Sequence, residues 1–244
     1  MRRFTALVIA AIGVLGAAPA DAADPPRRYP PAVLREPPPP RPIASGWYLR
    51  GDLGYRWNVL NHAEPPTGFP APADEKLSGG WSAGIGAGFK ADSLRVDVTA
   101  DYGTRFKYTG STAPAADTTA KLQAYTGLIN AYYEPYTWDR LTPYVGAGVG
   151  FAYVQVSDYT SSVVPPLTPV PASRKWNLAY ALMVGTSFNF SRQVLLDVGY
   201  RYLSIGTADT SADAAGRVMS FKDLAAHEVR IGVRLQFSDP PNMR

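Results

Sequence analysis

The side chains best suited to general-base chemistry are two histidines, His62 and His227, in a chain without cysteine. Catalysis by a serine nucleophile needs a histidine base that is oriented by a third group. His62 stands among prolines, and Glu228 lies on the opposite face from His227 if the chain is extended there. We therefore predict that the chain is not an enzyme and needs no metal or cofactor. Metal or haem capture by His62 with loop tyrosines such as Tyr159 is the weaker alternative.

Charged residues alternate with apolar ones in HEVRIGVRLQF, residues 227–237. This period of two is typical of a β-strand with two unlike faces. The same alternation elsewhere places six arginines and five acidic residues on one side of the strands. We predict that they form one charge network: Arg50, Asp52, Arg56, Arg95, Asp97, Asp101, Asp197, Arg201, Glu228, Arg230 and Arg234.

Eight alternating segments must position these charges, and none has helical periodicity. In the fourth, Leu122 and Leu128 fall on the opposite side from Tyr125, so we expect a bulge or a misread strand there. The eight segments are Gly46–Asn58, Gly80–Lys90, Leu94–Tyr102, Lys121–Glu134, Pro143–Val154, Trp176–Phe188, Val194–Leu203 and His227–Phe237.

Connector lengths alternate as well. Long polar or proline-rich loops follow odd segments: Asn58–Ser78, Gly103–Ala120, Ser157–Lys175 and Ser204–Asp223. Short turns follow even segments: Ala91–Ser93, Pro135–Thr142 and Ser191–Gln193. This rhythm predicts an all-β fold, an eight-stranded antiparallel up-and-down barrel over residues 46–237, with both termini at the short-turn end.

The segments outside the barrel have distinct compositions. Residues 1–22 have a basic start, a short apolar run and small residues at the end, which predicts a cleaved secretory signal peptide. Residues 23–45 are rich in proline and predict an extended periplasmic linker, and residues 238–244 form a short tail. Removing the signal lowers the net charge from +4 to +3, which argues against nucleic acid as a partner.

Aromatic residues decide which face of the barrel meets water. If the apolar face lined a calyx, as in a soluble lipocalin, large rings would be expected at mid-strand. They gather instead at strand ends, as do the two interfacial girdles of a bilayer protein, so we predict a transmembrane barrel. The predicted girdle residues are Trp47, Trp57, Trp81, Phe89, Tyr102, Phe151, Tyr153, Trp176, Phe188, Tyr200, Tyr202 and Phe237.

The stretches YVGAGVGFAYV (144–154) and WNLAYALMVGTSFNFS…LLDVGYRYL (176–203), with a last strand ending at Phe237, resemble the small eight-stranded outer-membrane barrels. These are the OmpA/OmpX-like proteins, and the chain is most similar to their alphaproteobacterial surface-antigen and opacity-like porin branch. The resemblance implies a Gram-negative cell outer membrane with periplasmic termini, and recognition of the last strand by the barrel-assembly machinery. The tail after Phe237 departs from the usual aromatic end.

Three functions are compatible with this pattern. We expect a structural or surface-interaction role (envelope integrity, adhesion or surface antigen), with the lumen filled by a salt-bridged network. The arginines would reach toward glycine-lined walls at Gly84–Gly88 and Gly146–Gly150. The alternatives are a narrow, weakly anion-preferring porin and a soluble lipocalin-like ligand binder. Expected partners are outer-membrane lipids, lipopolysaccharide and a host or cell-surface ligand at the long loops.

Overall fold

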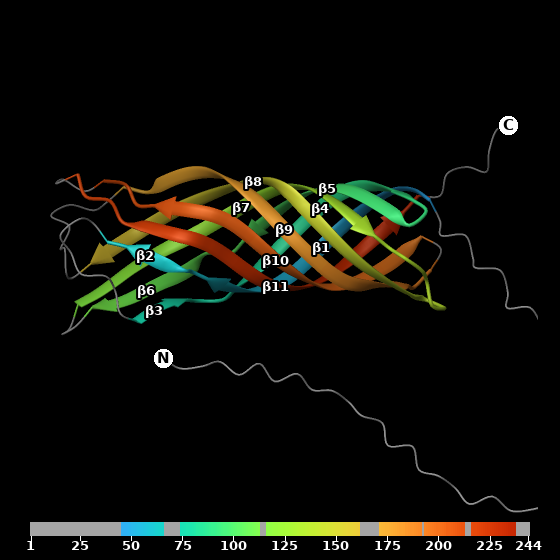
Figure 1. Cartoon of the computed structure of the whole chain (residues 1–244), viewed down its shortest axis with the longest axis horizontal. Coiled ribbons are helices and arrows are strands. Elements are labelled where there is room, and N and C mark those ends of the chain that lie inside the picture. Colours follow the sequence, from blue (N-terminus) through green and yellow to red (C-terminus); the bar gives the residue numbers. More distant parts are fainter. Residues whose placement is uncertain are drawn as a thin grey trace, which may run out of the picture. The chain divides into compact units, whose positions relative to one another are not determined.

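Every regular element that the structure describes is a β-strand (Figure 1). The computed structural model describes residues 45–65, 74–112, 116–161, 171–191, 193–212 and 216–237. The predicted signal peptide, the linker up to residue 44 and the tail at 238–244 lie outside the described residues. Within the described part, no helix is long and apolar enough to cross a membrane.

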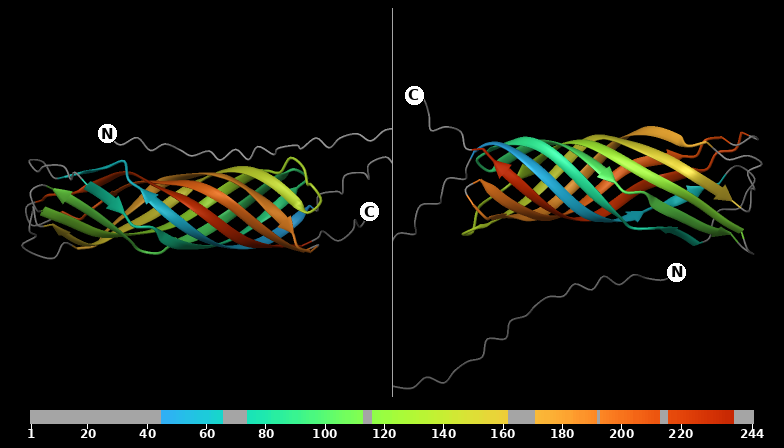
Figure 2. Two further views of the ribbon diagram at one scale, coloured as in Figure 1. Left: turned by 90° about the horizontal axis from the view of Figure 1, so that it is seen from below. Right: turned by 180° about the vertical axis from the view of Figure 1, so that it is seen from behind.

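Eight long antiparallel strands close into a barrel, which confirms the predicted fold (Figure 1, Figure 2). They are β1 (Gly46–Val59), β4 (Gly80–Ala91), β5 (Leu94–Gly103), β7 (Ala116–Tyr133), β8 (Leu141–Ser161), β9 (Ser173–Asn189), β10 (Val194–Asp209) and β11 (Ser220–Gln236). Each strand pairs with the next in this order, and β11 pairs back to β1 from Tyr48–Gln236 to Val59–Ala225. Closure leaves no free strand edge in this section, which a bilayer requires.

Five strands, β7 to β11, continue past the predicted boundaries, so the long loops are shorter than predicted. The first predicted loop contains β2 (His62–Glu64) and β3 (Asp74–Leu77), and the second contains β6 (Phe106–Thr112). The ends of β8, β10 and β11 take up much of the third and fourth loops. We call this upper section of the barrel the extension.

The boundaries were predicted too short because the polarity of the two faces reverses in the extension. Leu203 and Ile205 of β10 are buried inside, whereas Ser204 between them points outward. On β11, Phe221 lies inside and Lys222 outside. An apolar-out rule that holds for the lower section fails here, because the outer face of the extension is charged and its inner face is apolar.

The fourth predicted strand is regular over the stretch in which a bulge was expected. The register between β7 and β8 is continuous from Lys121–Ser157 to Tyr133–Val145, and the only shift in this pair lies between Thr119 and Lys121. Leu122 and Leu128 are fully buried inside the barrel. They share a face with lumen residues because the inner face of β7 changes from polar to apolar along its length.

The wall of the extension is divided by a seam between β2 and β3. β2 pairs with β11 and β3 pairs with β6, and no ladder joins β2 to β3. The Glu75 side chain crosses the seam, where its Oε1 accepts hydrogen bonds from the Ala63 amide (2.9 Å) and the Tyr108 hydroxyl (3.0 Å). One carboxylate thus substitutes for the missing ladder bonds at this position.

Candidate functional site: the charged lumen

The lower barrel turns its apolar side chains outward. Val229, Ile231 and Val233 are 44%, 59% and 43% exposed, while the side chains of Arg230 and Arg234 are 10% and 0% exposed. No charged side chain lies on the outer face between the aromatic bands among the described residues. In a bilayer, one outward Arg or Lys at the midplane would cost about 2–4 kcal/mol. The lipocalin alternative is wrong, because its apolar residues would have to face one another inside.

All twelve residues predicted as girdle point outward, and none is buried. Trp47, Phe89, Phe188 and Phe237 lie near the short-turn end, and the other eight lie toward the extension. The upper band is nearly continuous: Tyr102, Tyr125, Tyr153 and Trp176 follow one another on adjacent strands with ring centroids 5.4, 6.3 and 5.0 Å apart. Tyr180, which looks mid-strand in the sequence, joins this band through Tyr202.

The two bands are separated by about one bilayer core. Trp47 and Trp57 of β1 are ten residues apart, which at about 3.3 Å per residue and a tilt of about 40° gives a height of roughly 25 Å. Everything above Trp57, including β2, β3 and β6, therefore lies outside the hydrocarbon.

The lower lumen holds one cluster of charges around Glu134. The Glu134 carboxylate contacts Lys90, Arg95 Nε (2.9 Å) and Arg234 Nη1 (3.3 Å). Asp197 shares Arg95 (3.6 Å) and Arg234 (3.4 Å). The Arg95 guanidinium also lies 3.9 Å from the ring centroid of Tyr132, in cation–π contact.

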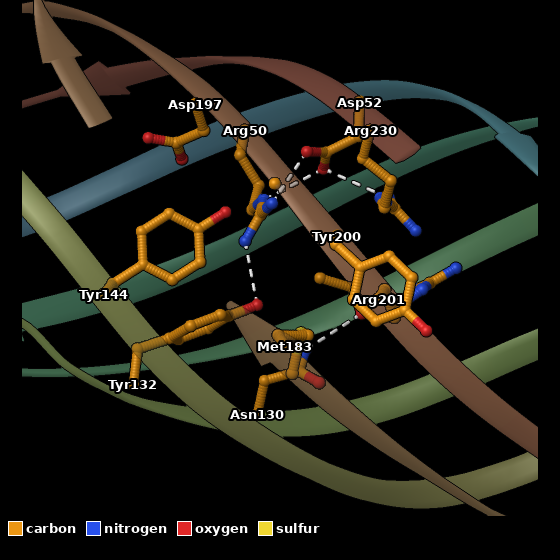
Figure 3. Close-up of a pocket in the computed structure, with 12 residues that line it drawn as sticks. Arg50, Asp52, Asn130, Tyr132, Tyr144, Met183, Asp197, Tyr200, Arg201 and Arg230 are labelled. Atoms are coloured by element: carbon orange, nitrogen blue, oxygen red, sulfur yellow. Dashed lines mark hydrogen bonds and ion pairs between the residues drawn. The ribbon is translucent and has the colours of Figure 1, made fainter. Parts of the chain in front are cut away.

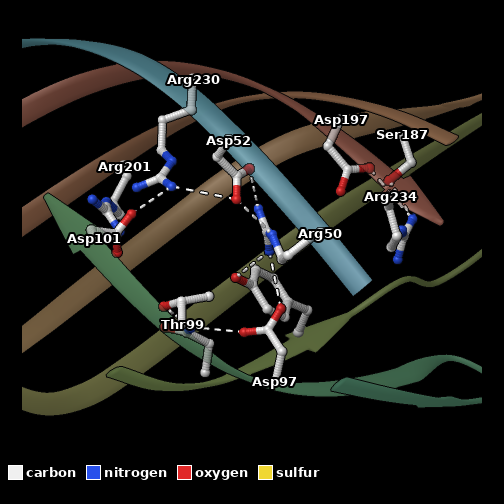
Figure 4. Close-up of polar contacts among 12 residues, drawn as sticks. Arg50, Asp52, Asp97, Thr99, Asp101, Ser187, Asp197, Arg201, Arg230 and Arg234 are labelled. Atoms are coloured by element: carbon white, nitrogen blue, oxygen red, sulfur yellow. Dashed lines mark hydrogen bonds and ion pairs between the residues drawn. The ribbon is translucent and has the colours of Figure 1, made fainter. Parts of the chain in front are cut away.

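The upper lumen holds a second cluster around Glu228 and Asp101, and Figure 4 shows Asp101 beside Arg201 and Arg230. Glu228 pairs with Arg56 (2.7 Å) and Arg201 (2.6 Å). Asp101 pairs with Arg201 (2.9 Å) and Arg230 (2.7 Å). These residues lie just below the upper aromatic band, so the charges occupy the membrane section only on its inner side.

Arg50 connects the two clusters. Its guanidinium contacts Asp52 (2.7 Å), Asp97 (3.0 Å) and the Tyr132 hydroxyl (3.0 Å), and Asp52 in turn contacts Arg230 (3.5 Å). The structure thus brings all eleven predicted charges together in one chain of contacts along the barrel axis. Each of these eleven charged side chains has at least one oppositely charged partner, so ordinary ion pairing explains why they are buried together.

Several ion pairs cross the full width of the lumen. β5 and β10 stand four strands apart in the eight-stranded ring, and they are joined by Asp101–Arg201 and Arg95–Asp197. β11 and β7 also stand four apart, and Arg234 of β11 reaches Glu134, which directly follows β7. Side chains that meet across the diameter leave little open cross-section.

Two charged members of the network were missed by the sequence prediction, Lys90 and Glu134. Each is the last residue of a predicted strand and points inward by alternation, because Lys90 stands two residues after Gly88 and Glu134 two residues after Tyr132. Extending the alternation to the last residue of each strand would have found them. The tyrosines Tyr48, Tyr132 and Tyr144 were left out for a different reason, because the predicted network counted only charged side chains.

The predicted glycine walls make room for the network only in part. A Cβ at Gly84 would come within 3.0 Å of the Arg230 guanidinium, and one at Gly86 within 3.2 Å of the Arg50 side chain. The glycines of β8 face other groups: Gly146 meets the Tyr132 ring and Gly148 meets the Asn130 side chain. The wall on β4 thus accommodates arginines as predicted, but the wall on β8 does not.

A small cavity of about 20 Å³ lies beside Arg50, Tyr132 and Asp197 (Figure 3). That is room for about one water molecule. Above the upper cluster the inner residues become apolar and form a second layer, here called the apolar plug. It includes Phe106, Leu122, Leu203, Phe221 and Leu224, each no more than 2% exposed.

A family model described as outer membrane protein beta-barrel domain matches residues 7–237. The chain belongs to this outer-membrane β-barrel family. The family and the barrel together place the protein in the Gram-negative outer membrane, as the sequence predicted.

Two relatives and one solved structure are similar to this outer-membrane barrel over most of its length. An uncharacterized protein of Brucella suis is 31% identical over 97% of this chain and all of its own. A Rickettsia conorii protein named as an adhesin is 26% identical over 79% of this chain and 82% of its own. The crystal structure of Neisserial surface protein A is 23% identical, with a TM-score of 0.50 over 80% of this chain and 99% of its own, which shows the shared fold.

The two histidines lie outside the lumen. His62 of β2 is exposed, with its Nε2 3.3 Å from the Glu64 carboxylate. His227 of β11 points outward and contacts the Tyr200 hydroxyl and the Tyr202 ring. Neither histidine is hydrogen-bonded to a serine within the described ranges, so the geometry offers no nucleophile with an oriented base. No group of three or more His, Cys, Asp or Glu suited to hold a metal occurs among the residues described.

Proposed function

We propose that the protein is a closed, non-conducting outer-membrane barrel with a structural role in the envelope and a surface-interaction role at its outer end. The observation that carries the proposal is the set of ion pairs across the lumen diameter, Asp101–Arg201, Arg95–Asp197 and Arg234–Glu134. An ion that entered would have to separate charges that are already paired in a site with little water. Breaking a buried pair costs about 3–5 kcal/mol, so permeation through this lumen is disfavoured.

The apolar plug adds a second barrier in series. Phe106, Leu122 and Phe221 close the axis above the charges, and the Tyr108 and Phe221 rings contact edge to face at 4.9 Å between centroids. Apolar constrictions of this kind exclude water and hence ions. The anion-preferring porin, which requires one wet path from end to end, therefore has less support than a sealed barrel.

Conductance of the pure protein in planar bilayers tests this proposal. Folded protein, identified by heat-modifiable migration in SDS gels, should insert without any steady open state. The triple variant Phe106→Ala, Leu122→Ala, Phe221→Ala removes the apolar plug but keeps the ion pairs, and should remain closed. A stable open state of the unaltered protein with anion preference would instead establish the porin.

The surface-interaction role is supported by the extension and by the relative named as an adhesin. The strands of the extension continue well above the upper aromatic band, and loops on rigid scaffolds commonly carry binding. The predicted long loops contain apolar and proline residues. Pro66, Phe69, Pro70 and Val163–Val170 lie outside the described residues, and Pro65 lies within them.

Loop deletion tests the surface role separately from closure. Cells that expose the barrel without residues 66–73 and 162–170 should bind cultured epithelial monolayers less than cells that expose the whole protein. Deleting the short turn residues 191–193 at the other rim is the matched control, and should leave binding unchanged. Equal binding by all three would remove adhesion from the proposal while leaving the sealed barrel intact.

A further inference from the structure

We propose that one side of the extension binds the phosphate groups of lipid A in the outer leaflet. The surface consists of four exposed cations that point outward directly above the upper aromatic band: Arg105, Lys107, Lys121 and Arg174. We call these four residues the basic ledge. The proposal needs only the outer-membrane location, and it does not depend on whether the lumen conducts.

The strand registers place the ledge residues in two rows above the aromatic row. Tyr102, Tyr125, Tyr153 and Trp176 are directly paired across β5, β7, β8 and β9. Two residues higher, Gln123 pairs with Gln155, which pairs with Arg174, and Arg105 Nε donates to Gln123 Oε1 at 3.3 Å. Two residues higher again, Lys107 pairs with Lys121.

The height of these rows matches the headgroup layer. Two residues along a strand tilted by about 40° correspond to roughly 5 Å, so the rows stand about 5 and 10 Å above the aromatic row. The headgroup region on each side of the hydrocarbon is roughly 5–8 Å thick. Arg105 and Arg174 thus lie within this layer and the two lysines at its outer edge, where phosphates attached to acyl-bearing sugars are found.

The pairing within the ledge is unfavourable without an anion. Lys107 and Lys121 face each other directly across two strands, and like charges in that position destabilise a sheet. Lys121 has one acidic partner, Asp158, at 2.9 Å with both side chains more than half exposed. Among the residues described, Arg105, Lys107 and Arg174 form no ion pair. A bound phosphate would relieve the repulsion and pair the remaining cations.

Two other cations of the extension have carboxylate partners. Lys222 of β11 pairs with Glu64 of β2 at 3.2 Å, and Lys175 of β9 pairs with Asp209 of β10 at 2.7 Å. Below the ledge, the paired residues Ala100 and Gly127 are small, and a Cβ at Gly127 would meet nothing within 4 Å. The wall under the aromatic row is therefore open to acyl chains on the same side as the ledge.

The test measures binding of bis-phosphorylated lipid A and of fully dephosphorylated lipid A to folded protein in detergent micelles, by native mass spectrometry. The unaltered protein should prefer the phosphorylated form by at least about tenfold. The variant Arg105→Gln, Lys107→Gln, Lys121→Gln, Arg174→Gln should lose the preference. The matched control, Lys222→Gln with Arg140→Gln, removes exposed cations elsewhere and should keep it.

Three outcomes would overturn the proposal: equal binding of both lipid A forms by the unaltered protein, a preference that survives in the four-fold variant, or equal competition by phosphatidylglycerol vesicles. The first and third need no variant. If the four-fold variant does not fold, Arg105→Gln with Arg174→Gln replaces it, and it should lower the preference severalfold. Preference unchanged in that double variant would equally contradict the assignment.

Discussion

At the scale of single residues, the lumen depends on carboxylates that each serve several cations. Glu134 is fully buried and contacts Lys90, Arg95 and Arg234. Replacing Glu134 with Gln keeps the shape but leaves Arg95 and Arg234 with Asp197 as their carboxylate, and it removes the ion pair of Lys90. We expect the free energy of unfolding in lipid, measured by urea titration, to fall by about 3–5 kcal/mol. The control is Glu64→Gln, which removes an exposed glutamate paired with Lys222 and should lower the free energy of unfolding far less.

Outside the membrane section, the interaction of Glu64 with Lys222 and His62 makes a contribution to stability that depends on pH. The hydrogen bond of Glu64 to Lys222, together with His62, holds the pKa of the carboxyl below its ordinary value of 4.5. Because the folded pKa is depressed, the associated stabilisation is present above about pH 4.5 and is lost as the pH falls through the folded pKa. Lys222→Gln should raise the pKa of Glu64, as followed by carbon NMR of the carboxyl. A pKa that stays the same in this variant would show that the pair does not persist in solution.

At the scale of strands, the contact between β7 and β8 leaves no room for a side chain at one glycine. A Cβ at Gly150 would lie 2.0 Å from the Gly127 carbonyl oxygen, and backbone cannot move aside as a flexible side chain can. Gly150→Ala should therefore lower the free energy of unfolding by about 1–3 kcal/mol. Gly127→Ala, on the outer face with no atom within 4 Å, should change it little. Equal effects of the two substitutions would mean that this close approach is absent.

The seam between β2 and β3 gives a second prediction at this scale. The Ala63 amide donates to Glu75 rather than to a neighbouring strand. Glu75→Ala should speed hydrogen exchange of that amide by roughly five- to tenfold, which corresponds to about 1 kcal/mol for one lost hydrogen bond. Asp74→Ala removes an exposed neighbouring carboxylate and should leave the rate as it was. No acceleration in Glu75→Ala would show that another group satisfies the amide.

The sequence was sufficient to predict a strand and its orientation where one face is charged and the other is apolar along the whole strand. Alternation from Val229 to Leu235 predicted both the strand and its orientation, because charge on one side and aliphatics on the other leave one arrangement in lipid. It was insufficient where the polarity of the two faces reverses, as at Ser204 and Ile205 in β10. Which carboxylate meets which arginine also could not be predicted, because pairs such as Asp101 with Arg201 join residues one hundred positions apart across the barrel.

At the scale of the whole molecule, the outer face and the inner face of the barrel both reverse their polarity between the membrane section and the extension. In the membrane section the outer face is apolar and the lumen is charged; in the extension the outer face carries Lys107, Lys121 and Lys222 while the inside is the apolar plug. The medium around the barrel determines the polarity of each outer face: lipid surrounds the membrane section and water surrounds the extension. Only the lower half has the inverted arrangement of a membrane protein, and the upper half is organised as a soluble barrel.

The most direct test of this account is a spin-label scan along β8, which is practical because the chain has no native cysteine. Single cysteines at outward positions 145, 149 and 151 should give labels reached by oxygen in the bilayer, and those at 155 and 157 labels reached by a water-soluble nickel complex. Labels at the inward positions 152 and 154 should be shielded from both. Water access at 149, or lipid access at 155 and 157, would contradict the reversal of polarity on which the account rests.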